Sequence, residues 1–346
     1  MSSPLLHLPA HLTPSAALHI SQQAPLLLQD QPSLSLPFLY SSESTEKWAI
    51  YEHLLLACLR TGDDKSARLC LERLSNRFGA TSERVMGFKG MYQEAVAEDD
   101  ATLERILKRY EDILVEDPTN TVGLSFTLAV VTTLANFEEP IAKRRITLLR
   151  SMPKPEEAIS ALVKLLDMSP TDAEAWSELS DLYLSQGLYQ QAIFSLEEVL
   201  LIAPNAWNIH ARMGEVIFIS LNASVSANDV DVEKGLSESM RWFCRSIELC
   251  DDYLRGYYGL KFMSGRLLPL LSKNHNGAST SGGAESGSNL QFSLATVQKL
   301  NQLATAKLSE IVRKSSAGDW AEYGYGRAEV IAARELLDRD KQPMER

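Results

Sequence analysis

The sequence has few cysteines, and none is placed for metal binding. The four of them form no Cys-x-x-Cys pair, and no histidine lies at ligand spacing from any of them. Because a zinc site needs several convergent donors, we expect no metal site and no cofactor. All four lie in helical patterns, which predicts small buried side chains in a reducing compartment. They are Cys58, Cys70, Cys244 and Cys250.

Basic charge and long apolar runs are also scarce. The formal net charge of −11 argues against a nucleic-acid partner, because such proteins need a basic patch to displace counterions from phosphates. No apolar run approaches the roughly 20 residues needed to span a bilayer. No lysine or arginine precedes Lys47, so we expect no secretory or mitochondrial signal. These features predict a cytoplasmic protein without a direct membrane span.

The common catalytic motifs are missing as well. The chain has no G-x-S-x-G, no Walker A loop and no G-x-G-x-x-G. Only His53 and His210 lie in the helical part, and neither has a nucleophile or carboxylate at triad-like spacing. We therefore expect no catalytic residue and no small-molecule substrate.

What the chain does have is a helical repeat, clearest in "AWSELSDLYLSQGLYQQAIFSLEEVLLIAPN" at 175–205. Apolar residues follow a helical period on both sides of a glycine, and Thr171 with Glu174 indicates a capping box. Two prolines, Pro170 and Pro204, lie one repeat of 34 residues apart. This order resembles the tetratricopeptide repeat. The structural signature positions are Trp176, Leu179, Tyr183, Gly187, Ala192, Leu196 and Pro204.

Further, more degenerate units predict an all-α fold, a right-handed superhelical solenoid of tetratricopeptide repeats over residues 44–271. Before it, the Leu/Pro/Ser-rich segment 1–43 is expected to be largely irregular, because its prolines break helices. After it, 272–289 is Ser/Gly-rich and predicts a flexible loop, and 290–346 predicts capping helices. A polar loop is expected near 220–232. About 18 surplus residues near 122–140 are either an extra buried helix or a translated intron.

Partner contacts in such arrays come from first-helix residues that lie off the signature and line a concave groove. The corresponding positions here are neutral or acidic for the most part. A co-chaperone clamp for acidic tails needs lysine, arginine and asparagine at those positions, so that clamp is disfavoured. The candidate partner-binding residues are Glu174, Ser177, Asp181, Asn208, Ala211, Glu215, Arg255 and Tyr258.

Three motifs, "KGM..EA", "ILVEDPTNT" and "AWSELSDLY", follow one another along the chain. Over roughly residues 45–265 the sequence resembles the family of subunit 2 of the endoplasmic reticulum membrane protein complex, in a fungal form. The resemblance implies a non-catalytic scaffold, peripheral on the cytoplasmic side of the endoplasmic reticulum membrane. Its partners would be the other subunits of an insertase for tail-anchored and multi-pass proteins. The alternative is a free cytosolic tetratricopeptide adaptor or co-chaperone.

Overall fold

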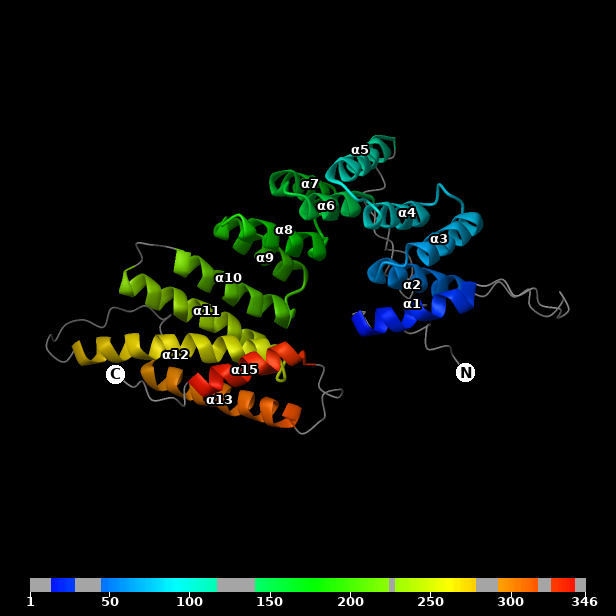
Figure 1. Cartoon of the computed structure of the whole chain (residues 1–346). Helices are drawn as coiled ribbons and strands as arrows, with labels where there is room; N and C mark the ends of the chain where they lie inside the picture. Colours follow the sequence, from blue (N-terminus) through cyan, green and yellow to red (C-terminus); the bar gives the residue numbers. More distant parts are fainter. Residues whose placement is uncertain are drawn as a thin grey trace. The chain divides into compact units, whose positions relative to one another are not determined.

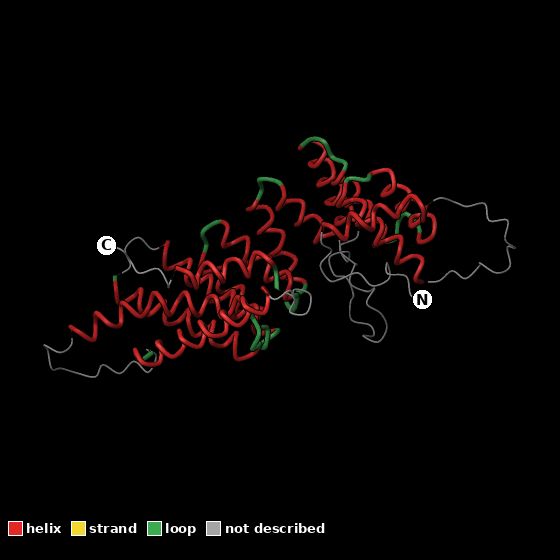
Figure 2. The backbone as a smooth tube through the Cα atoms, turned by 60° about the horizontal axis from the view of Figure 1, so that its bottom comes forward, coloured by secondary structure: helices red, strands yellow, loops and turns green. Residues whose placement is uncertain are grey.

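The computed structural model describes residues 14–28, 45–116, 141–223, 228–277, 292–316 and 325–339, and the regular structure in these ranges is α-helical (Figure 2). The all-α tetratricopeptide-repeat prediction is confirmed. The chain divides into two compact units, Met1–Pro170 and Thr171–Arg346. The earlier division into four segments, at residues 43, 271 and 289, stays a prediction.

The first unit contains seven described helices, and neighbours along the chain pack against one another (Figure 1). Its main apolar core joins the first four of them. These helices are α1 (Pro14–Leu28), α2 (Thr45–Thr61), α3 (Asp64–Phe78), α4 (Glu83–Ala95), α5 (Asp100–Glu116), α6 (Ile141–Ser151) and α7 (Pro155–Met168).

The second unit contains the remaining described helices, again with each packed on the next along the chain (Figure 1). Its last helix contacts both of the two long helices before it. They are α8 (Ala173–Ser185), α9 (Tyr189–Ile202), α10 (Trp207–Ala223), α11 (Asp229–Leu249), α12 (Leu254–Gly277), α13 (Leu294–Ser316) and α15 (Arg327–Arg339).

The hairpin of α8 and α9 shows how the repeat forms. Gly187 adopts a φ of 74°, a left-handed conformation that glycine adopts without steric cost, and the chain reverses there. Ala192 is fully buried, and the Ser180 hydroxyl donates to its carbonyl oxygen at 2.9 Å, so small residues let the two helices approach closely. Leu179 and Leu196 fill the space beside them. The signature positions therefore hold two helices together.

The capping box expected at Thr171 is wrong by one residue. The N-cap of α8 is Asp172, whose carboxylate accepts a hydrogen bond from the amide of Ala175 at 3.1 Å. Aspartate and threonine are both good N-caps, so the sequence offers two neighbouring candidates. Aspartate has the further advantage over threonine that an acidic side chain interacts favourably with the positive end of the helix dipole.

The prediction that prolines exclude a helix from residues 1–43 is wrong for α1. Pro14 occupies the first helical position, where the missing amide proton is not needed, and Pro25 is exposed in the last turn. The inward face of α1 carries a buried apolar stripe that packs on α2 and α3. Burial of this stripe outweighs the one hydrogen bond lost at Pro25. The stripe is Ala17, Ile20, Ala24 and Leu28.

A buried polar cluster joins α4, α5 and α6. The hydroxyl of Tyr110 donates to Oε1 of Glu94 at 2.6 Å, and Arg144 forms an ion pair with the other oxygen of the same carboxylate. Gly90 allows this approach, because a Cβ there would lie 2.1 Å from the Tyr110 hydroxyl. Burial, followed by the charge of Glu94, raises the pKa of Tyr110. Both carboxylate oxygens of Glu94 are therefore engaged inside the first unit.

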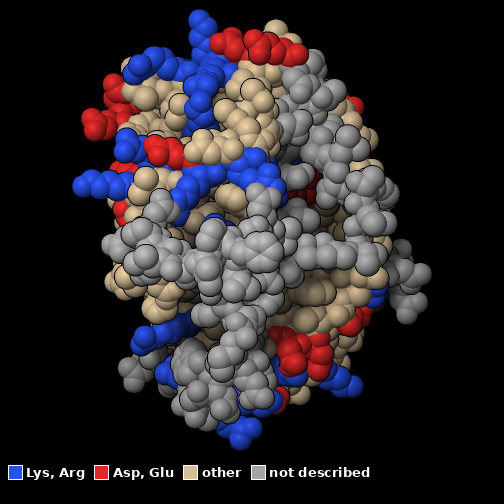
Figure 3. Space-filling model, turned by 90° about the vertical axis from the view of Figure 1, so that its right-hand side faces the viewer, with Lys and Arg blue, Asp and Glu red and all other residues tan. Residues whose placement is uncertain are grey.

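Surface ion pairs in the first unit are mostly solvated. Arg145 and Glu111 approach to 2.7 Å, and Lys154 and Glu104 to 3.3 Å. Figure 3 shows one face of the molecule, on which lysine and arginine side chains lie beside aspartate and glutamate side chains. Exposed pairs of this kind contribute about 0–1 kcal/mol each.

The structure moves the boundaries of two predicted loops, and a third predicted segment lies outside the described residues. The polar loop expected near 220–232 is shorter, because α10 runs to Ala223 and α11 begins at Asp229. The prediction of a flexible loop at 272–289 is wrong for residues 272–277, because α12 continues to Gly277. The helix does so although it contains an exposed proline, Pro269. The surplus residues near 122–140 lie outside the described residues.

Candidate functional site

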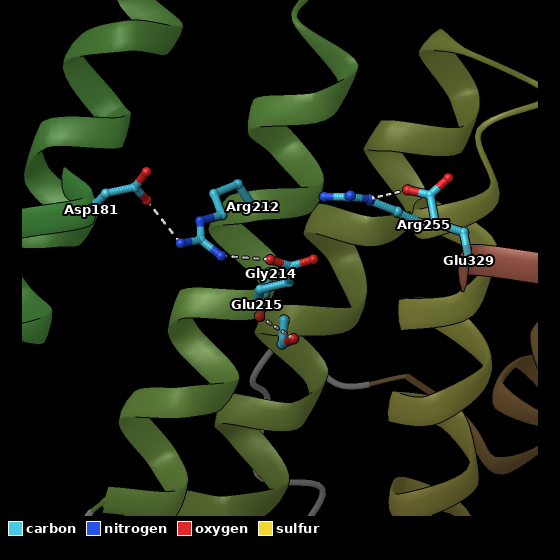
Figure 4. Close-up of polar contacts among 7 residues, drawn as sticks. Asp181, Arg212, Gly214, Glu215, Arg255 and Glu329 are labelled. Carbon is cyan, nitrogen blue, oxygen red and sulfur yellow. Dashed lines mark hydrogen bonds and ion pairs between the residues drawn. The ribbon is translucent and has the colours of Figure 1, made fainter. Parts of the chain in front are cut away.

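Five charged side chains form a row across α8, α10, α12 and α15, which we call the acid–arginine ladder (Figure 4). Arg212 bridges two acids: its Nη2 lies 2.8 Å from Oδ1 of Asp181, and its Nη1 lies 2.9 Å from Oε2 of Glu215. Arg255 Nε lies 2.7 Å from Oε1 of Glu329. Each arginine therefore ties one of these helices to another that carries a carboxylate.

The two arginines of the ladder keep their positive charge at neutral pH. Burial lowers the pKa of Arg212, but its hydrogen bonds to Glu215 and Asp181 outweigh this effect and raise it overall. For Arg255 the hydrogen bond to Glu329 is the largest influence, and it raises the pKa. Because these side chains are substantially exposed, the pairs add little stability. Their main effect is to fix the position of charge on this surface.

An apolar pocket of 360 Å³ opens beside the ladder, between α10, α11, α12 and α15. Two aromatic side chains on its wall, Phe218 and Phe262, pack edge to face with their ring centroids 5.5 Å apart. The ring of Tyr258 stacks on that of Phe262, with a centroid distance of 6.5 Å. Gly259 lets Phe243 reach the floor, since a Cβ at Gly259 would lie 2.1 Å from that ring. The lining is completed by Glu215, Ile219, Leu254, Arg255, Met263, Glu329 and Ala332.

Potential nucleophiles and metal ligands in the described residues are poorly placed for chemistry. Burial raises the pKa of the Cys58 and Cys70 thiols to about 12, so both are protonated at neutral pH. The ring of His210 stacks on that of Trp242 with a centroid distance of 5.5 Å, and its Nε2 lies 2.9 Å from the carbonyl oxygen of Pro204. The described part of the chain has no group of three or more His, Cys, Asp or Glu that could hold a metal ion.

Two comparisons decide the family. A family model described as the EMC2 TPR-like repeat domain matches residues 100–227. The TPR repeat protein oca3 of Schizosaccharomyces pombe is 34% identical over 226 residues, which cover 65% of this chain and 69% of that protein.

The chain belongs to the EMC2 family.

Other EMC2-family relatives are more distant. ER membrane protein complex subunit 2-A of Xenopus laevis is 30% identical over 63% of this chain, which spans 62% of the frog protein's length. The Saccharomyces cerevisiae ER membrane protein complex subunit 2 is 25% identical over 63% of this chain and 69% of its own length. A solved structure from Cytophaga hutchinsonii, the C-terminal part of a TPR repeat-containing protein, covers 92% of this chain and 93% of its own at a TM-score of 0.47 and 12% identity.

Within this EMC2-family fold, the structure brings together four of the eight candidate partner-binding residues. Asp181, Glu215 and Arg255 belong to the ladder, and Tyr258 lines the pocket with two of them. Glu174 and Asn208 are exposed in the first turns of α8 and α10, away from these contacts. The half-buried Ser177 donates its hydroxyl proton to the carbonyl oxygen of Ala173. Partner binding by all of these residues stays a prediction.

Ala211 is the exception, and its assignment to the partner-facing surface is wrong. It is 1% exposed and packs in the core with Leu236, Met240 and Phe243. Ala211 lies one repeat of 34 residues after Ser177, which is itself half-buried. The next residue, Arg212, carries its guanidinium at the surface, where it links two acids. Leu179 and Met213, also 34 residues apart, are both buried, so α8 and α10 bury the same face, and α11 covers Ala211 more completely than Ser177 is covered.

Sequence reasoning missed Arg212, Phe218, Phe262 and Glu329. Arg212 was detectable in principle, because a basic residue three positions before Glu215 faces the same side of a helix. The pocket aromatics Phe218 and Phe262 lie one turn beyond the candidate positions on their helices. Glu329 could not have been found, because it is 74 residues from Arg255 and no repeat spacing connects them.

Among the described residues, no helix is long and apolar enough to cross a membrane.

Proposed function

We propose that this chain is a non-catalytic scaffold subunit of the endoplasmic reticulum membrane protein complex. It holds together cytosolic parts of an insertase for tail-anchored and multi-pass membrane proteins. The single observation that supports this most is the family match, together with relatives named as subunit 2 of that complex. The ladder and pocket supply a preformed surface of the kind that protein partners use.

Localisation follows from the same proposal. The chain lies at the endoplasmic reticulum membrane, peripheral on its cytoplasmic side, and is held there by protein contacts with the other subunits. Anionic lipid is a poor substitute for those contacts, because the net charge of −11 opposes adsorption to an acidic membrane surface. Neither nucleic acid nor a small-molecule substrate is a partner in this proposal.

A free cytosolic adaptor or co-chaperone is the alternative. It is disfavoured by the ladder, whose three carboxylates would repel the acidic tails that co-chaperone clamps bind. A clamp would also need unpaired lysines or arginines at these positions, whereas Arg212 and Arg255 are both engaged with carboxylates.

Fractionation followed by purification separates the two functions. We expect the tagged chain to pellet with microsomes, to leave the membrane with mild detergent, and to co-purify with several membrane-embedded subunits of one complex. High salt alone should release only part of it, because the contacts with those subunits are partly apolar. Recovery in the soluble fraction with cytosolic chaperones alone would show that the adaptor is correct and the scaffold is not.

A further inference from the structure

A third arginine, Arg266, lies against two aromatic residues of the pocket wall and differs from the two arginines of the ladder. Arg266 lies on α12, and its guanidinium carbon is 4.8 Å from the ring centroid of Phe262 and 5.1 Å from that of Phe218. It is exposed, and it makes no ion pair with any residue of the described part of the chain. By contrast, Arg212 and Arg255 are neutralised by ladder carboxylates.

The pocket therefore has two chemically different ends. Arg255 and Arg266 are both on α12, eleven positions apart in the sequence, which corresponds to about 16 Å along a helix axis. At the Arg255 end lie the carboxylates of Glu215 and Glu329, already paired. At the Arg266 end lie aromatic faces and an unneutralised positive charge. An occupant with an apolar body and one negative charge fits the pocket in one direction only.

The walls of the pocket also suit a single bulky apolar group. Its floor is made by buried residues of the main core of the second unit, including Phe243, Leu254 and Met263, so it is rigid. Its volume of 360 Å³ is at the low end of the roughly 300–1,000 Å³ typical of ligand pockets. Preformed apolar pockets of this kind hold the anchor side chains that dominate protein interfaces.

We propose that the pocket takes one bulky aliphatic or aromatic side chain of a partner polypeptide, and that Arg266 pairs with a carboxylate of the same segment. The inference rests on the proposed scaffold function and gives the chemistry of one partner contact. A polypeptide fits better than a lipid, because the paired charges of the ladder continue beside the pocket across α8 and α10. A lipid tail has no polar groups that could interact with that charged row.

Two substitutions on exposed side chains test the proposal. Ala332→Trp fills the pocket from α15, and Arg266→Glu reverses the charge at its rim. Their matched controls make the same changes on an exposed face of α13, at Ala306→Trp and Arg313→Glu. The probe is a display library of random short peptides, selected on the full-length purified chain, followed by synthetic peptides measured by fluorescence anisotropy.

The expected result is enrichment of peptides that combine a bulky apolar residue with an aspartate, a glutamate or a terminal carboxylate. Each of the two test substitutions should weaken binding by about tenfold or more, and the controls should not. Replacing the peptide carboxylate by lysine should abolish binding to the wild type and restore binding to Arg266→Glu. This reciprocal exchange requires direct pairing and does not follow from a change in folding.

Three outcomes would overturn the proposal. The first is enrichment of peptides whose binding survives both substitutions, and the second is selection of peptides without an acidic group. The third is failure to enrich any peptide while a fatty acid binds the wild type and not Ala332→Trp. None of these depends on which subunits co-purify with the chain, so the scaffold function and the pocket assignment can fail separately.

Discussion

At the scale of single residues, Ala192 is the clearest point at which to test the helical repeat. It is fully buried, and its carbonyl accepts a hydrogen bond from Ser180 on the facing helix. Ala192→Arg would overpack this contact and bury a charge, so we expect a loss of about 3 kcal/mol or more in the free energy of unfolding. Thermal and urea unfolding measure this loss.

The matched control is Gln191→Arg, one position earlier on an exposed face of the same helix. It should leave stability within about 0.5 kcal/mol of the wild type. Ala192→Arg should also abolish co-purification with the other subunits, and Gln191→Arg should not. Normal assembly of Ala192→Arg would mean that the register of the repeat is not the one described.

The thiols of Cys58 and Cys70 predict alkaline instability. Burial raises the pKa of each to about 12, above the ordinary thiol value near 8.5. Between these two values the unfolded chain loses thiol protons that the folded chain keeps, so the free energy of unfolding falls as pH rises. Urea unfolding at pH 8 and at pH 10 should show this fall, with a shallower one in a Cys58→Ala, Cys70→Ala variant. Equal slopes in the two proteins would exclude the thiols as its cause.

The residue scale also shows where sequence patterns succeed and fail. Leu179, Ala192 and Leu196 were predicted in the packing seam because their spacing follows the repeat, and all three are buried. Ala211 was misplaced because its repeat counterpart, Ser177, is only half-buried, and the spacing does not show how completely the next helix covers that position. That coverage depends on the neighbouring helix, here α11, whose Phe243 and Ser239 approach α10 closely at Gly214.

At the scale of helices, α15 is the element that closes the second unit. It presents a buried stripe to α13 and α12, and Glu329 pairs with Arg255 at its first turn. Ala333→Asp places a carboxylate at a fully buried position of this stripe. We expect α15 to detach, at a cost of about 3 kcal/mol. Hydrogen exchange should then increase in α15 and in the face of α13 that it covers.

Ala328→Asp is the control for this prediction, because Ala328 is exposed on the same helix. It should leave exchange in α13 unchanged. Detachment should also remove Glu329 and Ala332 from the pocket, so peptide binding should weaken in Ala333→Asp and not in the control. Unchanged exchange in both variants would contradict the assignment of α15 as a packed cap.

Element boundaries were the least predictable part of the fold. The proline rule excluded a helix that α1 nevertheless forms, because an amphipathic face of four buried residues outweighs one missing amide. The Ser/Gly-rich composition placed the end of α12 too early, although the helix extends to Gly277. Local composition predicts the tendency of a segment, whereas packing against neighbours determines where a helix ends.

At the scale of the whole molecule, each of the two compact units has apolar clusters of its own. In arrays of helical repeats stability is largely local, since each repeat contacts its neighbours. We therefore expect Ala192→Arg to lower hydrogen-exchange protection in α8–α11 while α1–α3 keep theirs. A uniform loss of protection throughout the chain would show that the molecule unfolds as one cooperative unit.

Arg144, Glu94 and Tyr110 join helices that are far apart in the sequence. These three residues fix α6 against α4 and α5, although 24 residues, 117–140, separate α5 from α6 in the sequence. In general, doubling the length of a flexible connection costs only about 0.6 kcal/mol in loop-closure entropy. A hydrogen bond to a charged group contributes about 1.5–3 kcal/mol. The contacts of this cluster therefore hold α6 against α4 and α5 in space, independently of the sequence distance between α5 and α6.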